Sequence, residues 1–452
     1  MLACYDARQL PSGLESTLYL GGPERLRRMS PHAPRVLLLG ALVAAVSVRA
    51  QTTSVSSALG DNNGIRFGPG RLHPYFDLEG RYDSAAVYVP VDPNNPAGAY
   101  ELKGDILMHF RPGFRLDVPG TDVTFGLNGY YDYVWYTGLI SDTSAPSRSE
   151  AGADMHAEIN REGAVELDVA DTFSRSDRPR DIGLGVAVIS LYNQLRLTAP
   201  IHPGGRAFEV RPHGEYSVEF FSSYSGIPQG IGPCPPGTCP GNPSDPSVND
   251  YQNYAGGLDI HWKFLPQTAL IFESNFEGRS YFHPDASVVA PGKILKLLAG
   301  AQGLVTPRIQ AILKAGYAIG FDGAASTFIG QGEVTWTPNE SSALTLGVLR
   351  DVNNAVGAAS ATDFRVYLNT KTFLIGRLGL HGNFAYDLIA FTQGRGQNDQ
   401  LFSIDIGPDY AIARWFILSA GYVFSKRSSD YATSLPLNYS RNEAYLRLTF
   451  TY

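Results

Sequence analysis

The sequence predicts an all-β fold: a closed, antiparallel, up-and-down transmembrane β-barrel of about eighteen strands. Three observations predict it. Apolar and polar residues alternate from about Leu72 to the last residue, the connections between the alternating segments are in turn short and long, and aromatic residues gather near segment ends. Alternation with a period of two is the pattern of a strand, whose successive side chains point to opposite faces.

A secretory signal peptide is predicted ahead of this part. The apolar run at 36–48, VLLLGALVAAVSV, is too short for a membrane-spanning helix, which needs about 20 residues. Arginines precede the run, and the small residues around Arg49 predict cleavage after Ala50. Met29 is an alternative start, which would make residues 1–28 an upstream extension instead of part of a long leader.

The mature chain is expected to have two parts. The polar stretch 51–70 is predicted to be a flexible periplasmic segment, and residues 71–452 are predicted to form the barrel. Charged residues make up 17% of the chain, below the roughly 25% of a typical soluble domain. The net charge of −7 and the lack of a basic tract exclude nucleic acid as a partner.

The alternation is clear in 76–83, where apolar or small residues at even positions oppose charged residues at odd ones. Such segments are about ten residues long, which is the length that a tilted strand needs to cross a membrane. They centre near residues 78, 110, 129, 155, 169, 193, 214, 258, 275, 300, 315, 332, 346, 366, 383, 406, 420 and 447.

The connections fall into two classes. Short, turn-like ones lie at 119–121, 161–163, 202–205, 265–268, 306–307, 338–341, 371–374 and 413–414. Long ones lie at 84–104, 137–148, 222–250, 351–362, 392–399 and 426–440. This rhythm is typical of barrels with short periplasmic turns and long outer loops.

A soluble β-sandwich or propeller would also alternate, with its apolar face inward. The regular short and long connections favour the barrel, and so do aromatic residues near strand ends, where membrane barrels carry their girdles. These aromatic residues are Tyr131, Tyr133, Trp135, Trp262, Phe264, Trp336, Trp415 and Phe416.

A few residues fit the pattern less well. Asp171 is predicted to face lipid, toward the outer end of its strand. Pro112, Pro212 and Pro408 fall inside strands, where each lacks a backbone N–H for the sheet, so bulges or strand ends are expected there.

If the apolar residues face lipid, the charged ones line a lumen, and a barrel of this size has room for a water-filled channel. For each such residue the alternative is a simple ion pair across the lumen. The predicted pore-lining residues are Asp77, Glu79, Arg81, Arg111, Arg115, Asp132, Asp154, His156, Glu158, Glu209, Arg211, Glu215, Asp259, Lys263, Arg365 and Asp405.

Two clusters of residues have the chemistry of a metal site or a disulfide. Asp154, His156 and Glu158, beside Glu166 and Asp168, offer metal-ligand chemistry, but carboxylates on adjacent strands near arginines are the simpler interpretation, so no metal or cofactor is predicted.

The second cluster is the cysteine pair in loop 222–250. Cys234 and Cys239 are too few for a zinc site and predict a loop disulfide in an oxidising compartment, with two free thiols as the alternative.

The last ten residues, EAYLRLTFTY, form the most regular strand pattern of the chain. Leu446, Leu448, Phe450 and Tyr452 are predicted to point outward. A barrel closes only when its last strand pairs with its first, so this segment is expected to pair with residues around 76–82.

With its signal peptide, its strand rhythm and its terminal YLRLTFTY, the chain resembles Gram-negative outer-membrane β-barrel proteins. Over residues ~70–452 it looks most like porin-type barrels of about eighteen strands, some of which are linked with exopolysaccharide secretion. The resemblance implies an outer-membrane location, contact with outer-membrane lipid, and periplasmic export partners of unknown identity. It also implies that Leu446, Leu448, Phe450 and Tyr452 are a signal for the barrel-assembly machinery.

The predicted function is a porin-like channel for hydrophilic solutes or a conduit for polysaccharide. A structural or adhesion barrel, with a closed lumen and partner-binding outer loops, is the main alternative. A barrel-embedded hydrolase is less favoured, because the sequence has no G-x-S-x-G motif and no evident Ser–His pair. The chain is therefore not predicted to be an enzyme.

Overall fold

The computed structural model describes most of the predicted barrel. The described residues are 64–92, 100–142, 145, 147–161, 163–178, 181, 188–203, 207–224, 246–265, 267–283, 291–339, 341–375, 377–394, 396–431 and 437–452. The predicted signal peptide, its cleavage site, and Cys234 with Cys239 lie outside them. All described residues belong to one compact unit, Gly40–Tyr452.

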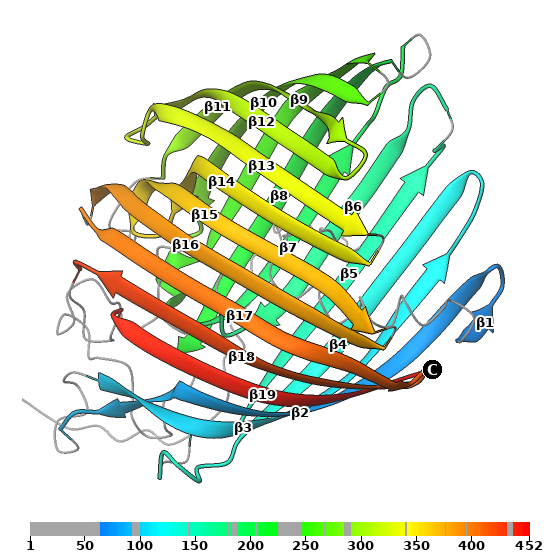
Figure 1. The fold of residues 1–452 in the computed structure, drawn as a ribbon. Coiled ribbons are helices and arrows are strands. Elements are labelled where there is room, and N and C mark those ends of the chain that lie inside the picture. Colours follow the sequence, from blue (N-terminus) through cyan, green and yellow to red (C-terminus); the bar gives the residue numbers. More distant parts are fainter. Residues whose placement is uncertain are drawn as a thin grey trace, which may run out of the picture. The chain divides into compact units, whose positions relative to one another are not determined.

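Nearly all of the described residues lie in β-strands (Figure 1). The strands are β1 (Ile65–Phe67), β2 (Gly70–Pro90), β3 (Tyr100–Val118), β4 (Val123–Tyr136), β5 (Arg148–Ile159), β6 (Leu167–Ser176), β7 (Val188–Thr198), β8 (Phe208–Tyr224), β9 (Tyr251–Leu265), β10 (Thr268–Tyr281), β11 (Lys293–Thr306), β12 (Ile309–Phe321), β13 (Thr327–Asn339), β14 (Ser342–Ala355), β15 (Ala358–Ile375), β16 (Leu378–Gly394), β17 (Asn398–Ala413), β18 (Phe416–Ser429) and β19 (Tyr439–Thr451). A 3₁₀ turn, η1 (Pro246–Asn249), precedes β9. Among the described residues, no helix combines the length and the apolar character that a membrane crossing requires.

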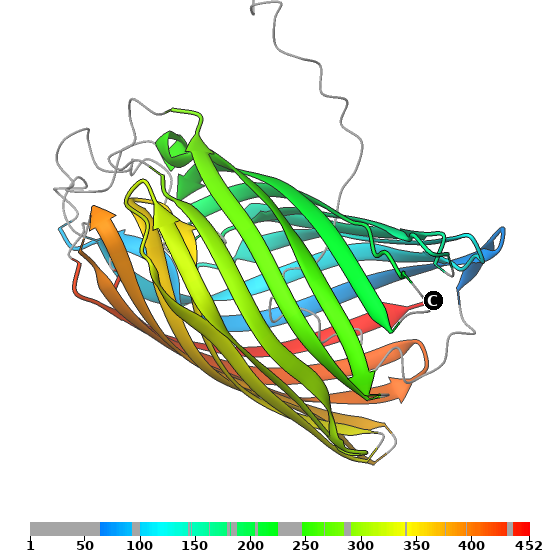
Figure 2. The ribbon, with the colours of Figure 1, turned by 90° about the horizontal axis from the view of Figure 1, so that it is seen from above.

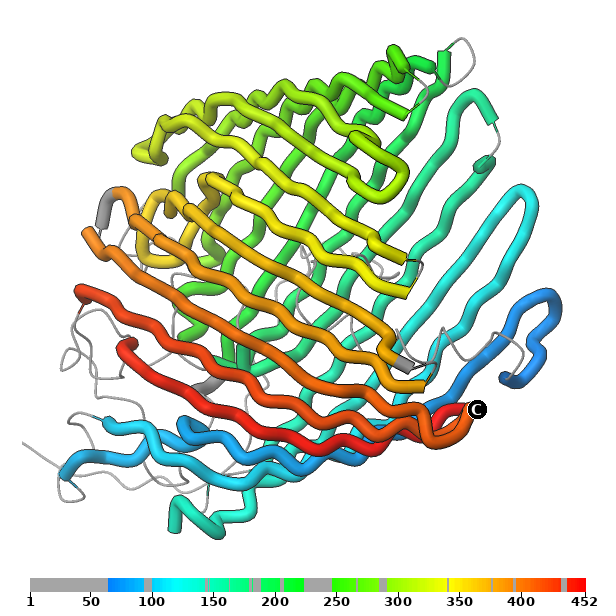
Figure 3. Tube along the Cα trace, viewed as in Figure 1, coloured from blue at the N-terminus to red at the C-terminus, as the bar shows by residue number. Residues whose placement is uncertain are grey.

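Strands β2 to β19 form a closed antiparallel ring, seen from two directions in Figures 1 and 2. Each strand pairs with the next one in the sequence, and β19 returns to pair with β2 through Leu448 opposite Leu78 and Phe450 opposite Phe76. The blue and red traces in Figure 3 show this seam. The predicted fold class, an eighteen-stranded up-and-down barrel, is confirmed. The short β1 only extends β2 as a hairpin beyond the ring.

The strand centres lie close to their predicted positions, but the predicted lengths were too short. The ring strands β2 to β19 contain 10 to 21 residues, the longest being β2. As a result, the long loop predicted at 351–362 is a tight turn at Val356–Gly357 between β14 and β15, and Gly357 has a φ of 75°. Strands continue past the membrane because their backbone groups still pair with neighbours where the side chains become polar and small.

The three prolines do not end their strands. Pro112 lies opposite Phe76 on β2, and the register between β3 and β4 is the same on both sides of it. Pro408 likewise interrupts the β17–β18 ladder without shifting its register. Pro212 lies opposite Leu258 and its carbonyl accepts a hydrogen bond from Ala199 at 3.0 Å. The expectation of bulges or strand ends was wrong, since each ladder simply omits the bond that proline cannot donate.

Asp171 is on the outer face, level with Met155 and Leu195. It is the fifth residue of the ten in β6 and therefore lies in the middle of its strand, not near the outer end as predicted. The side chain of Asn193 on β7 donates a hydrogen bond of 2.7 Å to it. This bond, and cover by neighbouring side chains that leaves Asp171 1% exposed, explain how a carboxylate is held there.

Candidate pore and its constriction

One face of the sheet is identified as the inner one by contacts that skip a strand. Lys314 on β12 reaches Glu273 on β10 at 3.1 Å, and Lys296 on β11 reaches Asp351 on β14 at 3.1 Å. Such contacts are geometrically available only on the concave side of a closed sheet. Register places all the predicted pore-lining residues on this face. Their role in conduction stays a prediction.

The outer face carries the predicted aromatic residues. Tyr131, Tyr133, Trp135, Trp262, Phe264, Trp336 and Trp415 are each exposed by more than 40%. Near the seam, the rings of Phe416 and Phe450 stack at 4.9 Å, with Trp415 beside Phe450. Large exposed rings at strand ends are what an interface with lipid headgroups accommodates.

Charged side chains at the seam form a dense network on the inner face. Glu79 is 1% exposed and pairs with Arg81 at 2.7 Å and with Arg447 at 2.5 Å. Arg81 also reaches Glu443 at 2.7 Å, and Arg111 pairs with Asp132 at 2.5 Å. Several predicted lumen residues therefore satisfy one another along the wall, as the ion-pair alternative allowed.

Other predicted residues are paired in the same way. Arg365 pairs with Asp387, Glu209 with Arg211, and Asp405 lies 3.7 Å from His381. Glu215 pairs with Arg196 at 2.8 Å.

The predicted cluster near the periplasmic turns is only partly brought together: Glu158 lies opposite Asp168 on β5 and β6. Asp154 accepts from Asn128 at 3.4 Å, Glu158 lies 3.5 Å from Arg161, and Glu166 lies 3.2 Å from His202. Within the described residues, no group of three or more His, Cys, Asp or Glu side chains could hold a metal ion.

The most informative feature of the lumen is a segment that crosses it. Arg178, just after β6, donates to Glu443 on β19 at 2.6 Å. Asp181, three residues later, accepts from Arg279 on β10 at 2.6 Å. In the ring of eighteen strands β10 and β19 are nine strands apart and thus opposite each other (Figure 1). We call the two described residues Arg178 and Asp181 the strap, because their side chains bond to opposite walls.

The strap is held differently at its two ends. The Asp181 and Arg279 side chains are only 1% and 5% exposed, whereas Arg178 is 49% exposed. The Arg279 guanidinium also lies 3.8 Å from the centre of the Tyr251 ring, a cation–π contact. Its other side chain–side chain bond is to Asn253, at 2.9 Å.

The tip of the β14–β15 hairpin completes this constriction. The backbone N–H of Val356 donates to the second carboxylate oxygen of Asp181 at 2.9 Å. Val356, Ala358, Ala359 and Ser360 are at most 1% exposed, so the hairpin tip is covered by other parts of the protein. A long outer loop was predicted at 351–362, but the chain forms a turn there that is tied to the strap.

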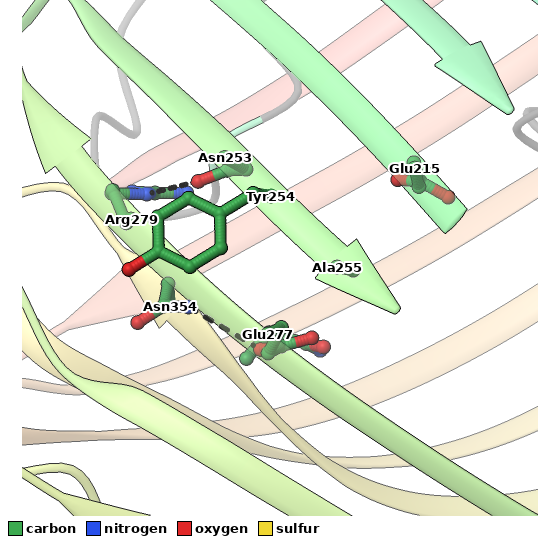
Figure 4. A pocket seen from close by; sticks show the side chains of 8 residues that line it. Glu215, Asn253, Tyr254, Ala255, Glu277, Arg279 and Asn354 are labelled. Carbon is green, nitrogen blue, oxygen red and sulfur yellow. Dashed lines mark hydrogen bonds between the residues drawn. The ribbon is translucent and has the colours of Figure 1, made fainter. Parts of the chain in front are cut away.

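A polar pocket lies beside the buried end of the strap (Figure 4). Its walls come from β8, β9, β10 and β14. The residues that line it include Glu215, Asn253, Glu277, Arg279, Asn353 and Asn354.

The sequence places Arg279 on the inner face, but it does not predict the contacts of Arg178, Asp181 or Glu443. A signal was present at residues 175–182, RSDRPRDI, where three arginines and two aspartates lie close together in the sequence. A loop that is exposed to solvent does not require so many opposite charges within a few residues, so this density indicates partners inside the protein.

Residues 250–452 match the model of a family described as "Putative beta-barrel porin 2". This match confirms the predicted resemblance to outer-membrane β-barrel proteins of the porin type, and with it the outer-membrane location. No curated protein sequence matches the chain.

Solved structures with a similar fold include outer-membrane proteins of two bacteria. OccAB3 of Acinetobacter baumannii is 11% identical, with 84% of this chain and 99% of that chain covered and a TM-score of 0.42. OpdK of Pseudomonas aeruginosa, solved with vanillate, is 11% identical, with 84% and 98% covered and a TM-score of 0.43. OccK9 (OpdG) of Pseudomonas aeruginosa is 11% identical, with 84% and 98% covered and a TM-score of 0.42.

Proposed function

We propose that this outer-membrane barrel of the porin type is a narrow diffusion channel for small hydrophilic solutes, with its width set by the strap. The observation that carries the proposal is the pair of bonds from Arg178 to Glu443 and from Arg279 to Asp181. The polar inner face supplies the water-filled path, and the strap divides it.

Simple dimensions support a narrow path. Four residues span at most about 14 Å of extended chain, so the rest of the distance between the two walls is filled by the side chains of the ion pairs. What remains open lies on either side of the strap. Such openings suit ions and single small molecules.

A polysaccharide strand would need a continuous wider path, so the strap favours small solutes over polymer export. The adhesion alternative requires a closed lumen and no flux. The family model that matches residues 250–452 describes porins. We therefore propose no enzymatic role.

Conductance of the purified protein in planar lipid bilayers tests the proposal. We expect ion-conducting steps in KCl, together with swelling of liposomes in isotonic monosaccharide but much slower swelling in a large oligosaccharide such as a dextran. Absence of both conductance and swelling would refute the channel and support the closed-lumen alternative. Equal rates for the monosaccharide and the dextran would instead support the polymer conduit.

A variant of the strap tests whether it sets the width of the channel. Asp181→Ala removes both bonds that hold the buried end of the strap while leaving the barrel wall untouched. We expect larger current steps and faster dextran entry than in the unmodified protein. Unchanged permeation of both probes would show that the strap does not set the width.

A further inference from the structure

We infer that the polar pocket beside the strap is a binding subsite for an uncharged, polyhydroxylated solute, a sugar-like molecule. The inference rests on the proposed channel function and names the class of solute that pauses at its constriction. Three properties of the pocket carry it: its place, its charge balance and its unused hydrogen-bonding groups.

The place of the pocket is set by four strands and the strap. Arg279 both lines the pocket and holds Asp181, so a solute in the pocket lies next to the buried end of the strap. Ala255 lies between Glu215 on β8 and Glu277 on β10 in register, and its small side chain leaves space between the two carboxylates. Figure 4 shows these residues on the pocket wall.

A break in the β14–β15 ladder brings two consecutive asparagines to the same pocket. The register shifts between Asn353 and Ala355, where the single residue Asn354 of β14 faces two residues of β15, Ala359 and Ser360, so a bulge lies on β15 opposite Asn354. In a regular strand, consecutive side chains point to opposite faces, and a bulge changes this direction locally. Both Asn353 and Asn354 therefore line the pocket.

The charges in and around the pocket nearly cancel. Glu215 is paired with Arg196, Glu277 lies 3.4 Å from Lys296, and Arg279 is paired with Asp181. Lys296 also bonds to Asp351 at 3.1 Å. The set of four carboxylates and three cations leaves one net negative charge, which disfavours an anion, and the pairing of the acids reduces the attraction for a cation.

What the pocket offers instead is a mixed set of hydrogen-bond donors and acceptors. Among the described residues, the bonds to Glu215 all go to Oε2 and leave Oε1 without a partner. The Asn353 side chain accepts from Lys296 at 2.8 Å but its amide N–H groups donate to no described residue. Asn354 donates to Glu277 at only 3.4 Å, and its buried Oδ1 accepts no bond. A hydroxyl group both donates and accepts, so a molecule with several hydroxyls can satisfy such a mixed set.

Three probes of similar size and different charge test the inference: D-glucose, D-glucosamine and D-gluconate. Each is added to the unmodified channel in a planar bilayer, and the half-blocking concentration of the ion current is measured. We expect glucose to block at a lower concentration than gluconate and about as well as or better than glucosamine. Block by gluconate equal to or stronger than block by glucose would overturn the assignment to an uncharged solute.

Two variants locate the site. Asn353→Leu removes the free amide donors, and we expect a half-blocking concentration for glucose about 3- to 10-fold higher, the effect of losing one or two neutral hydrogen bonds. Ala255→Leu fills the space while retaining every polar group, and we expect an increase of about fivefold or more from overpacking. The matched control is Asn369→Leu, an inward asparagine on β15 outside the pocket, which should leave the value unchanged.

Failure of the subsite can be told apart from failure of the channel. A protein that conducts ions but shows the same glucose block in both pocket variants has no subsite here, although it is still a channel. Calorimetric titration of glucose into the barrel in detergent micelles measures binding without requiring conductance. Glucose heats that Ala255→Leu abolishes and Asn369→Leu retains would support the subsite, and heats that both variants retain would overturn it.

Discussion

The two ends of the strap are fixed by ion pairs of similar geometry but very different surroundings. Arg178 and Glu443 meet at 2.6 Å, as do Arg279 and Asp181. Arg178 is half-exposed, and its partner Glu443 is buried but is also paired with Arg81 and Arg441, so it keeps compensation without Arg178. Both members of the other pair are buried, and Arg279 is also packed on Tyr251. The two ion pairs therefore contribute different free energies, although their distances are the same.

Exposed ion pairs contribute about 0–1 kcal/mol, because water and salt screen them. Removing one partner of a buried pair costs about 3–5 kcal/mol, because the other charge is left without compensation. The comparison teaches that the strap has a firm end at β10 and a weak end at β19. A strap with one firm end can stay in the lumen while its other end exchanges between bound and free.

The largest effect is expected from a change in β19, the strand that closes the barrel and carries Glu443. Without closure of the barrel, neither end of the strap can be bound. Deleting Tyr452, or replacing Phe450 and Tyr452 by Asp, should prevent accumulation in the outer membrane, since charge on a lipid-facing strand end blocks closure and the proposed assembly signal is lost. Phe450 stacks on Phe416, and the Tyr452 N–H donates to Pro74 at 3.1 Å. Immunoblots of separated membrane fractions measure the outcome.

The control for this change is Phe264→Asp on β9, an exposed outward residue near the same end of the barrel. If it lowers the outer-membrane level as much as the tail variants do, the effect is the general cost of a lipid-facing charge and not a property of the C-terminal strand. Normal levels of the tail variants would contradict both the seam and the signal.

The next largest effect is expected at the firm end. Arg279→Ala leaves the Asp181 carboxylate buried without its cation, and we expect a loss of about 3–5 kcal/mol in the free energy that holds the strap. The current steps should become larger and noisier. Single-channel recording measures this, and steps identical to those of the unmodified protein would show that Arg279 does not hold the strap.

The sequence alone was sufficient to predict the wall. Alternation is a local property, so the positions of β9 or β19 and the inward direction of Glu79 or Asp405 follow from the residues themselves. The ring could then be closed by pairing first and last strands. Strand ends were harder, because residues such as Asp351 and Asn353 have the composition of a loop but remain paired in the sheet.

The constriction could not be predicted in this way. The contacts of Arg178 and Asp181 join residues that are 265 and 98 positions apart in the chain, and no periodic pattern links them. Which outer connection folds inward depends on whether its charges find partners on both walls. Those partners, Glu443 and Arg279, are known only when the register of every strand between them is known.

A smaller effect is expected at the weak end. Arg178→Ala should cost about 0–1 kcal/mol, and the current steps should grow less than in Arg279→Ala because Asp181 still holds the strap. Arg115→Ala is the matched control, since Arg115 is a half-exposed inner-face arginine whose partner is Asp117, at 2.7 Å, and which has no contact with the strap. A larger change for Arg178→Ala than for Arg279→Ala would reverse the assignment of firm and weak ends.

The smallest and most specific effect is on salt dependence. The Debye length falls from about 10 Å at 0.1 M to about 3 Å at 1 M salt, and exposed pairs are screened far more than buried ones. Raising KCl from 0.1 to 1 M should therefore release the Arg178 end in the unmodified protein, whose conductance per unit of bulk conductivity should approach that of Arg178→Ala. The difference from Arg279→Ala should persist, because salt does not reach the buried pair. If the ratio between the unmodified protein and Arg178→Ala is the same at both concentrations, the exposed end does not respond to screening, and the two ends of the strap do not differ in the way that their surroundings predict.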